Sequence, residues 1–217
     1  MQWDLFVIIG GDMTCCLCPN QVSADSSEFW NKPLFETANF AVIPSLGSLV
    51  PGWLMVVPRT HVICAGALSL DLVHEMQQLS SQVVAHLERS FGQVCIFEHG
   101  PSTWRKSTGC SVDHAHLHIV PVGFDLAAAA QPFMPSNSDW QYGDWGSCRE
   151  AYLQGLDYLY IEQPVGLGRI STNTEFPSQV FRKAIAQQLG IIEQFSWRDF
   201  PKFDVAARTV EALTETH

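Results

Sequence analysis

The most informative segment of the chain is His114-Ala115-His116-Leu117-His118-Ile119-Val120-Pro121. Histidine alternates with small or apolar residues, so a strand over 114–120 would place three imidazoles on one face, about 6.5–7 Å apart. Three titratable groups on one strand face are costly to bury without partners. The row therefore indicates a site at which imidazoles carry out chemistry or bind a metal.

Two functions fit this row of histidines. In the first, His114 and His116 form a His-x-His pair that holds a catalytic zinc ion, with a water in the open position. In the second, one histidine is a nucleophile and its neighbours contact a phosphate. The residues of the row by themselves leave both functions open.

A second cluster of possible ligands lies near the start of the chain. Cys15 and Cys18 have the CxxC spacing of half a zinc site. His61 follows a predicted strand, where a side chain can be presented to a metal. Two thiolates and two imidazoles would close a tetrahedron and leave no position for water, so the site would be structural. We expect a structural Zn²⁺ on Cys15, Cys18, His61 and His114.

Composition limits the classes of partner. The chain has 217 residues, of which 47% are hydrophobic and 16% charged, and its net charge is −10. Such a composition is globular, and such a charge argues against sequence-independent binding to duplex nucleic acid or to an anionic membrane. The apolar run at 5–9 is too short to span a membrane and does not resemble a secretory signal. We expect a cytoplasmic protein.

The remaining pattern predicts an α+β fold. Apolar runs and helical periodicity predict strands over 40–43, 53–57 and 94–97 and a helix over 69–91. Beyond the row they predict a loop or linker over 131–148, a strand over 158–161 and helices over 178–189 and 203–213. We expect one domain over 1–124, including the N-terminal zinc-binding segment, and a helical C-terminal extension over 125–217 packed on it.

The histidine row resembles the signature of the histidine-triad (HIT) superfamily of nucleotide hydrolases and transferases, His-φ-His-φ-His-φ-φ with φ apolar. Gly109-Cys110-Ser111-Val112 is similar to the family's Gly-Gln-Ser-Val, and the segment over 53–62 resembles its strand followed by Pro-x-x-His. The resemblance covers about residues 12–122. It implies an antiparallel sheet of about five strands with packed helices, and often a homodimer.

The resemblance also implies a covalent mechanism. His116 would attack an α-phosphate and form a nucleotidyl-imidazole, while a backbone carbonyl holds its other ring nitrogen. His118 and Ser111 would contact the phosphate or the leaving group, and His114 is the metal ligand of the zinc-bearing branches. The substrate would be a dinucleoside polyphosphate, a nucleoside phosphoramidate or a nucleotide sugar. The alternatives are a metallohydrolase with catalytic zinc on His114 and His116, and a nucleotide-binding module without turnover.

One segment departs from the family pattern. Many members have Asn-x-Gly upstream of the triad, where this chain has Glu98-His99-Gly100. An ionised carboxylate cannot donate a hydrogen bond to phosphate, so Arg105 or Lys106 of the longer loop could replace the asparagine. The candidate substrate-binding residues are Gly109, Arg105, Lys106 and Glu98.

Near the start of the 178–189 helix, Arg182 and Lys183 add positive charge. A helix N-terminus with such charge could bind a phosphate. The same helix could instead pack on the sheet, and we favour packing.

Overall fold

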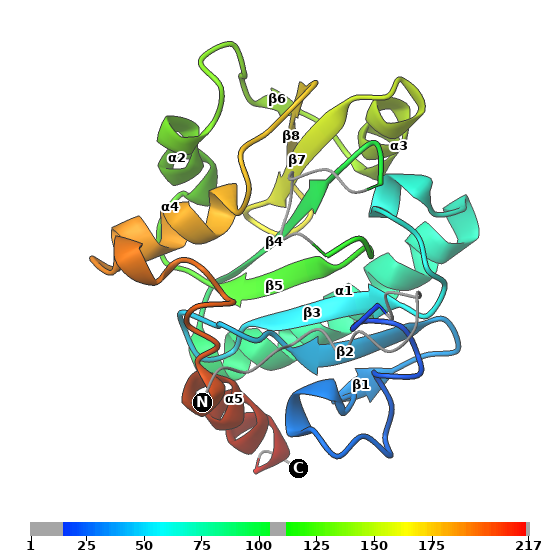
Figure 1. The fold of residues 1–217 in the computed structure, drawn as a ribbon, viewed down its shortest axis with the longest axis vertical. Coiled ribbons are helices and arrows are strands. Elements are labelled where there is room, and N and C mark those ends of the chain that lie inside the picture. Colours follow the sequence, from blue (N-terminus) through cyan, green and yellow to red (C-terminus); the bar gives the residue numbers. More distant parts are fainter. Residues whose placement is uncertain (1–14, 105–111, 216–217) are drawn as a thin grey trace.

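The computed structural model describes residues 15–104 and 112–215. These residues form an antiparallel sheet of eight strands in the order β1-β2-β3-β5-β4-β7-β8-β6 (Figure 1). The strands are β1 (Phe35–Glu36), β2 (Phe40–Pro44), β3 (Leu54–Pro58), β4 (Val94–Gly100), β5 (Leu117–Pro121), β6 (Gln141–Tyr142), β7 (Asp157–Glu162) and β8 (Gly168–Asn173). The helices are α1 (Leu70–Phe91), α2 (Leu126–Ala130), α3 (Trp145–Leu153), α4 (Val180–Gln188) and α5 (Phe203–Thr214), with 3-10 turns η1 (Phe29–Asn31), η2 (Ala65–Ala67), η3 (Gln131–Phe133) and η4 (Ile192–Gln194). The α+β class predicted from the sequence is confirmed.

The elements around the histidine row lie where the sequence predicted them. The three strands predicted before the row are β2, β3 and β4, and the long helix is α1. The hydroxyl of Ser69 accepts a hydrogen bond from the Leu72 N–H and caps α1. Gly92 ends the helix with a φ of 78°, a conformation that glycine adopts without strain.

The strand predicted over 114–120 is shorter than expected. β5 begins at Leu117 and pairs with β3 and β4, so two of the three histidines precede it. The backbone before Leu117 has other partners: the Ala115 N–H donates to the Val62 carbonyl, and the His114 carbonyl accepts from the His116 ring. Because these backbone groups form hydrogen bonds outside the sheet, only His118 of the three histidines lies within β5.

The two faces of the sheet have separate hydrophobic cores. Alternation along β4 sends Val94 and Ile96 to one face and Cys95 and Phe97 to the other. Helices α1 and α3 cover the first face, and α2 and α4 cover the second (Figure 1). The N-terminal segment around Leu17 packs beside β2 and β3 on the second face, so this face receives chain from both ends of the sequence.

The expectation of about five strands was wrong. Strands β6, β7 and β8 come from the region expected to be a helical extension, and β7 pairs directly with β4. All six residues of β7 are buried, so the sequence there shows no polar alternation. The segment predicted as a loop over 131–148 contains β6 and the start of α3. The division of the chain at residue 124 stays a prediction, and the sheet continues across it.

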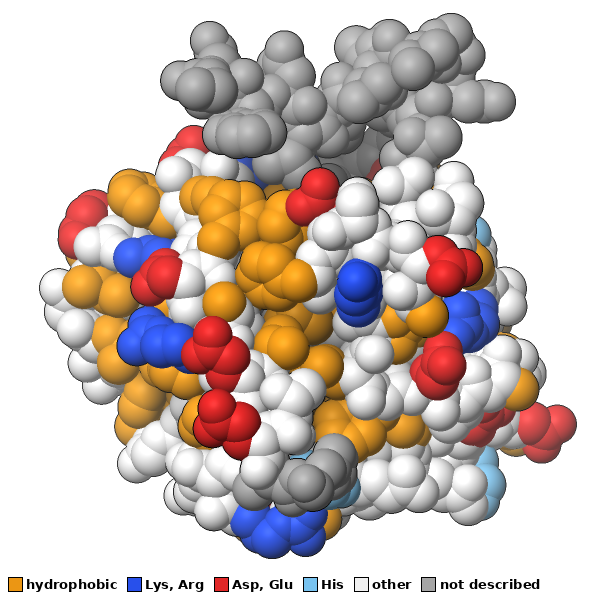
Figure 2. Space-filling view, turned by 90° about the horizontal axis from the view of Figure 1, so that it is seen from below, with side chains coloured by type: hydrophobic (Ala, Val, Ile, Leu, Met, Phe, Trp, Pro, Cys, Tyr) orange, Lys and Arg blue, Asp and Glu red, His pale blue; other side chains and the backbone are white. Residues whose placement is uncertain are grey.

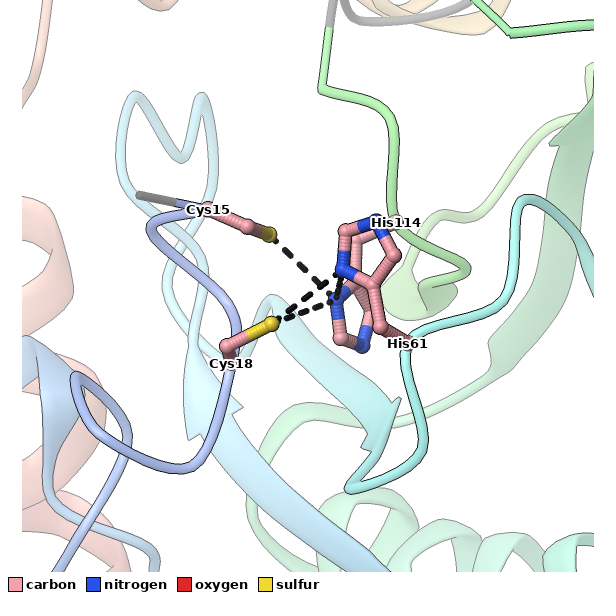
Figure 3. Close-up of side chains that lie close together, drawn as sticks. All are labelled: Cys15, Cys18, His61 and His114. Atoms are coloured by element: carbon pink, nitrogen blue, oxygen red, sulfur yellow. Dashed lines mark hydrogen bonds between the residues drawn. The ribbon is translucent and has the colours of Figure 1, made fainter. Parts of the chain in front are cut away.

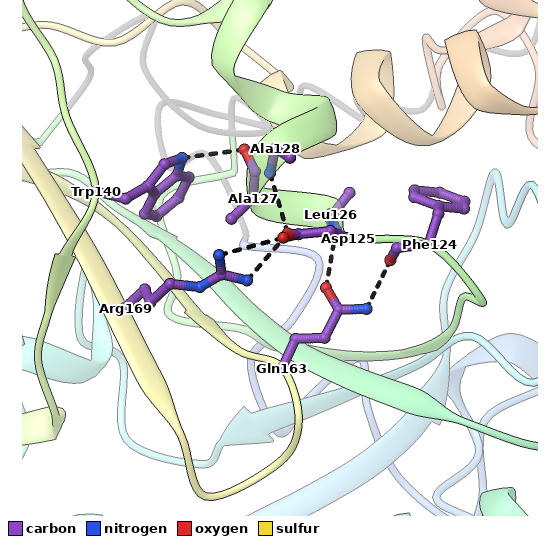
Figure 4. Close-up of polar contacts among 8 residues, drawn as sticks. All are labelled: Phe124, Asp125, Leu126, Ala127, Ala128, Trp140, Gln163 and Arg169. Atoms are coloured by element: carbon purple, nitrogen blue, oxygen red, sulfur yellow. Dashed lines mark hydrogen bonds and ion pairs between the residues drawn. The ribbon is translucent and has the colours of Figure 1, made fainter.

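A polar junction fixes α2 to the β7–β8 side of the sheet (Figure 4). Asp125 caps α2 by accepting from the Ala128 N–H at 3.1 Å, and it pairs with Arg169 of β8 at 3.0 Å. The Gln163 side chain donates to the Phe124 carbonyl at 2.7 Å and accepts from the Leu126 N–H at 2.8 Å. These contacts join the chain after β5 to the hairpin that extends the sheet.

One face of the molecule carries charged side chains of both signs, without a patch of either among the described residues (Figure 2). Seen from the end that carries β1 and α5, Lys and Arg side chains are scattered among apolar and acidic ones (Figure 2). Over residues 15–104 and 112–215, no helix is both long and apolar enough to cross a membrane.

Candidate functional site

Four side chains converge at the edge of the second face (Figure 3). They are Cys15 and Cys18 of the N-terminal segment, His61 after β3, and His114 before β5, and their possible ligand atoms all lie within 4.8 Å of one another. The CxxC turn is closed by a hydrogen bond from the Cys18 N–H to the Cys15 carbonyl at 3.2 Å. The structure therefore brings together the four residues that the sequence predicted as a metal site.

The distances within this cluster suit a tetrahedral ion. His61 Nδ1 lies 3.2 Å from His114 Nδ1 and 3.1 Å from Cys18 Sγ, and Cys15 Sγ lies 3.3 Å from His114 Nδ1. The edges of a tetrahedron of sulfur and nitrogen around zinc measure about 3.3–3.8 Å, from bond lengths of about 2.3 and 2.0 Å. The cluster could hold a metal ion with little rearrangement.

The protein also prepares one ligand for this role. His114 Nε2 lies 2.7 Å from the Pro58 carbonyl, which can only accept, so Nε2 carries the proton and Nδ1 presents its lone pair. Burial lowers the pKa of His114 to about 4, so the ring is neutral at pH 7. Burial raises the pKa of Cys15 to about 11, so metal binding would release its proton.

His116 has the opposite tautomer. Its Nδ1 lies 2.7 Å from the His114 carbonyl, which can only accept, so Nδ1 carries a proton, and in the neutral ring Nε2 keeps the lone pair. This is the backbone hydrogen bond that the resemblance implied for a nucleophilic histidine. An imidazole held this way is neutral at the nitrogen that would attack.

His118 lies on β5 beside this ring, with ring centroids 5.0 Å apart. The indole N–H of Trp53 donates to His118 Nδ1 at 3.0 Å, so the His118 proton is on Nε2. Burial, followed by the charges of His116 and then of Arg182, holds the pKa of His118 well below its usual range. The Nε2–H of His118 is therefore a donor beside the His116 ring.

Both rings line a cavity of about 260 Å³ on the second face of the sheet. Leu17 and Trp30 of the N-terminal segment form part of its wall. The opposite end of the chain contributes Arg182 of α4 and Trp197. A mainly apolar cavity with a few polar groups at one place is the usual form of a small-molecule site.

Glu98 does not lie in this cavity. It is 2% exposed on the first face, where it accepts hydrogen bonds from the Ala65 N–H at 2.7 Å and from the Tyr158 hydroxyl. A Cβ at Gly100 would lie 2.1 Å from the Tyr158 ring, so glycine there makes room for that contact. The prediction that Glu98 binds substrate is corrected, because strand alternation turns it away from the histidines.

The neighbour of Glu98 faces the histidine side instead. His99 pairs across the sheet with Leu159, which belongs to the second face, and its Nε2 is buried without a hydrogen-bond partner. Burial lowers the pKa of His99 to about 3. The other predicted loop residues, Arg105, Lys106, Gly109 and Ser111, lie outside the described residues.

Sequence reasoning gave no role to Trp53, and for the helix that carries Arg182 it favoured packing over phosphate binding. A lone tryptophan or arginine far from the row has no spacing signal, since only the fold brings it close. The one available signal was positive charge near a helix start in an acidic chain.

No protein-family model and no curated protein match the sequence. A solved Hit-like protein from Bartonella henselae matches at 12% identity and a TM-score of 0.35, covering 41% of this chain and 67% of that one. A GalT-like protein from Arabidopsis thaliana matches at 12% identity and a TM-score of 0.41, covering 91% of each chain. A uridylyltransferase matches at 12% identity and a TM-score of 0.43, covering 93% of this chain and 92% of that one. The function of this chain must therefore be argued from its own side chains.

Proposed function

We propose that this chain is a nucleotide hydrolase or nucleotidyltransferase that acts at an α-phosphate through a covalent intermediate on His116. The main support is the pair of opposite tautomers at the cavity, a lone pair on Nε2 of His116 beside a proton on Nε2 of His118. A phosphoryl group needs both, because its phosphorus accepts a nucleophile while its oxygens accept hydrogen bonds.

In the proposed first step, the Nε2 lone pair of His116 forms a bond to the α-phosphorus. The bond from phosphorus to the leaving group breaks, and the electron pair departs with the leaving group. His118 donates its Nε2–H to a phosphate oxygen or to the leaving oxygen and stabilises the charge that develops there. The His114 carbonyl, which holds the Nδ1–H, stabilises the positive charge on the His116 ring.

In the second step, water or another acceptor attacks the same phosphorus from solvent. The phosphorus–nitrogen bond breaks and its electron pair returns to His116 Nε2, while the acceptor's proton passes to solvent or to the departed leaving group. The proposed substrates are dinucleoside polyphosphates, nucleoside phosphoramidates and nucleotide sugars. From the HIT resemblance we propose Ser111 as a further donor and the loop residues Gly109, Arg105 and Lys106 as substrate contacts.

For the Cys15–Cys18–His61–His114 cluster we propose Zn²⁺ in a structural role. Two thiols and two imidazoles form a donor set that suits zinc, and four protein ligands leave no position for water. His116 lies outside this cluster, with its Nδ1 committed to a carbonyl. That arrangement favours the nucleophile over a catalytic zinc on His114 and His116.

The experiment incubates wild type and His116→Ala with one member of each proposed substrate class and analyses the products. We expect mononucleotide from wild type only, and acid-labile labelling of the wild-type protein by a substrate labelled at the α-phosphate. His74→Ala removes an exposed histidine of α1 and is the matched control. It should retain full activity.

Two results would contradict the proposal. Equal product release by wild type and His116→Ala would remove His116 as the nucleophile. Thermal stabilisation by nucleotides without any product would instead indicate a binding module, because ligand then raises the melting temperature without being consumed.

A further inference from the structure

Arg182 is a buried cation in the wall of the cavity. It lies on α4, is 2% exposed, and lines the same cavity as His116 and His118. Burying a guanidinium costs free energy unless its charge and donors are used. Arg182 therefore places a guanidinium, held by contacts within the protein, at the same cavity as the two histidines.

Two backbone carbonyls and one ring fix the orientation of this side chain. Nε donates to the Phe195 carbonyl at 2.8 Å, and Nη2 donates to the Gly47 carbonyl. The guanidinium carbon lies 5.0 Å from the centroid of the Trp53 ring. These contacts hold the guanidinium at the wall of the cavity that His116 and His118 also line.

The same contacts couple Arg182 to the proposed chemistry. Trp53, beneath the guanidinium, donates its indole N–H to His118. The positive charge also contributes to the low pKa of His118, so its field reaches the proposed phosphate donor. A group of opposite charge placed between Arg182 and His118 would be stabilised from both sides.

We propose that Arg182 binds a phosphate of the ligand and makes the cavity selective for anionic, phosphate-bearing molecules over uncharged ones. The inference rests on the proposed function, and it adds a specificity-determining residue that lies outside the histidine row. It assigns the C-terminal part of the chain a direct role in substrate recognition. An arginine suits this role because its planar donors match phosphate oxygens.

The test measures binding of inorganic pyrophosphate by titration calorimetry at fixed ionic strength. Arg182→Gln should weaken binding at least tenfold, the loss expected for one charged hydrogen bond. Lys183→Gln removes one positive charge from the neighbouring position of α4, outside the described cavity lining, and should change binding less than threefold. Arg182→Lys keeps the charge without the planar donors and should fall between the two.

Three results would overturn the inference. The first is equal pyrophosphate affinity of wild type and Arg182→Gln, and the second is an equal loss of affinity in Arg182→Gln and Lys183→Gln. The third is no binding by wild type at millimolar pyrophosphate. If Arg182→Gln does not fold, Arg182→Lys decides, since unchanged affinity in that variant contradicts planar recognition. Pyrophosphate binding does not require a nucleophile, so the inference and the proposed function fail separately. Product release by His116→Ala tests the proposed function, whereas the pyrophosphate affinity of Arg182→Gln tests the inference.

Discussion

His114 and His118 carry their protons on Nε2, whereas His116 between them carries its proton on Nδ1. A different group fixes the tautomer of each ring. It is the Pro58 carbonyl for His114, the His114 carbonyl for His116 and the Trp53 indole for His118. One ring can thus present Nδ1 to a metal, the next a lone pair to phosphorus, and the third a donor to an oxygen. The three rings can take different roles because each has one ring nitrogen held by a hydrogen bond, which leaves the other nitrogen for a ligand or a substrate.

Trp53→Phe tests the part of this division that concerns His118. The ring stays apolar and aromatic, but the donor to His118 Nδ1 is lost, so the tautomer with a proton on Nε2 loses its advantage. We expect kcat/KM for the proposed reaction to fall about tenfold, the equivalent of one hydrogen bond of about 1.4 kcal/mol. The measurement is steady-state kinetics with thermal melts of the same samples.

The control is Trp140→Phe, because the Trp140 indole donates to the Ala127 carbonyl in the α2 junction rather than to a histidine (Figure 4). It should lose stability without losing kcat/KM in folded protein. A Trp53→Phe enzyme with wild-type kinetics would show that His118 does not depend on this bond.

Glu98 allows a pH prediction on the other face of the sheet. Burial, partly offset by its hydrogen bonds from Tyr158 and Ala65, raises the pKa of Glu98 from 4.5 to about 7. Between these values the folded protein binds more protons than the unfolded chain, so this group lowers stability progressively as pH rises from about 4.5 to about 7. Glu98→Gln should reduce that loss by up to about 3 kcal/mol, measured by denaturant unfolding across this range.

The matched control for this prediction is Glu175→Gln, an exposed carboxyl beyond β8. It should leave the slope of stability against pH unchanged. An unchanged slope in Glu98→Gln would mean that Glu98 titrates normally in the folded protein.

At the scale of elements, the sequence predicted those whose pattern is local. Helix α1 has an apolar stripe, a serine cap and a terminal glycine, so its ends were predictable within one residue. β7 is buried on both faces and shows no alternation, and β6 and β8 close the sheet with only two and six residues. A strand was predicted over 158–161, where β7 lies, but its pairing with β4, about 60 residues earlier, was not, since no local pattern encodes such a contact.

Asp125→Ala tests how firmly α2 is joined to this added part of the sheet. The variant loses the cap of α2 and the pairing with Arg169, whose side chain is 24% exposed. A lost cap costs about 1 kcal/mol and a partly exposed ion pair less than that, so we expect about 1–2 kcal/mol of destabilisation. Chemical unfolding measures it, with Asp25→Ala at an exposed turn as the control expected within about 0.5 kcal/mol.

For the whole molecule, the cavity is assembled from both ends of the chain around the end of β5. The N-terminal segment brings Leu17 and Trp30, and the C-terminal part brings Arg182 and Trp197. The sequence predicted the histidines and the four residues of the possible metal site, because motif spacing indicates them. It could not predict the other residues that line the cavity, since they share no motif and come together only in the folded chain.

A metal ion bound at the proposed site would affect the whole fold, because the same N-terminal segment forms part of the cavity wall. Cys15 and Cys18 hold that segment, and Leu17 between them packs against β2 and β3 beside the cavity. Losing the ion should therefore loosen the wall and reduce nucleotide binding together with stability. A zinc that took part in the reaction would behave differently, because activity would disappear while the fold remained.

We expect one zinc per chain by elemental analysis and a fall in Tm of at least about 5 °C on chelation. That fall follows from an ion held at about 100 times its Kd, worth about 2.7 kcal/mol, at about 2–4 °C per kcal/mol for a chain of this size. Cys18→Ser should lose the metal and the stability together. Cys16→Ser is the control, since Cys16 lies between the two ligands but outside the cluster, and it should retain both. Chelated protein with an unchanged Tm and no activity would reverse the assignment and give the ion to catalysis, because stability and turnover would then depend on different parts of the site.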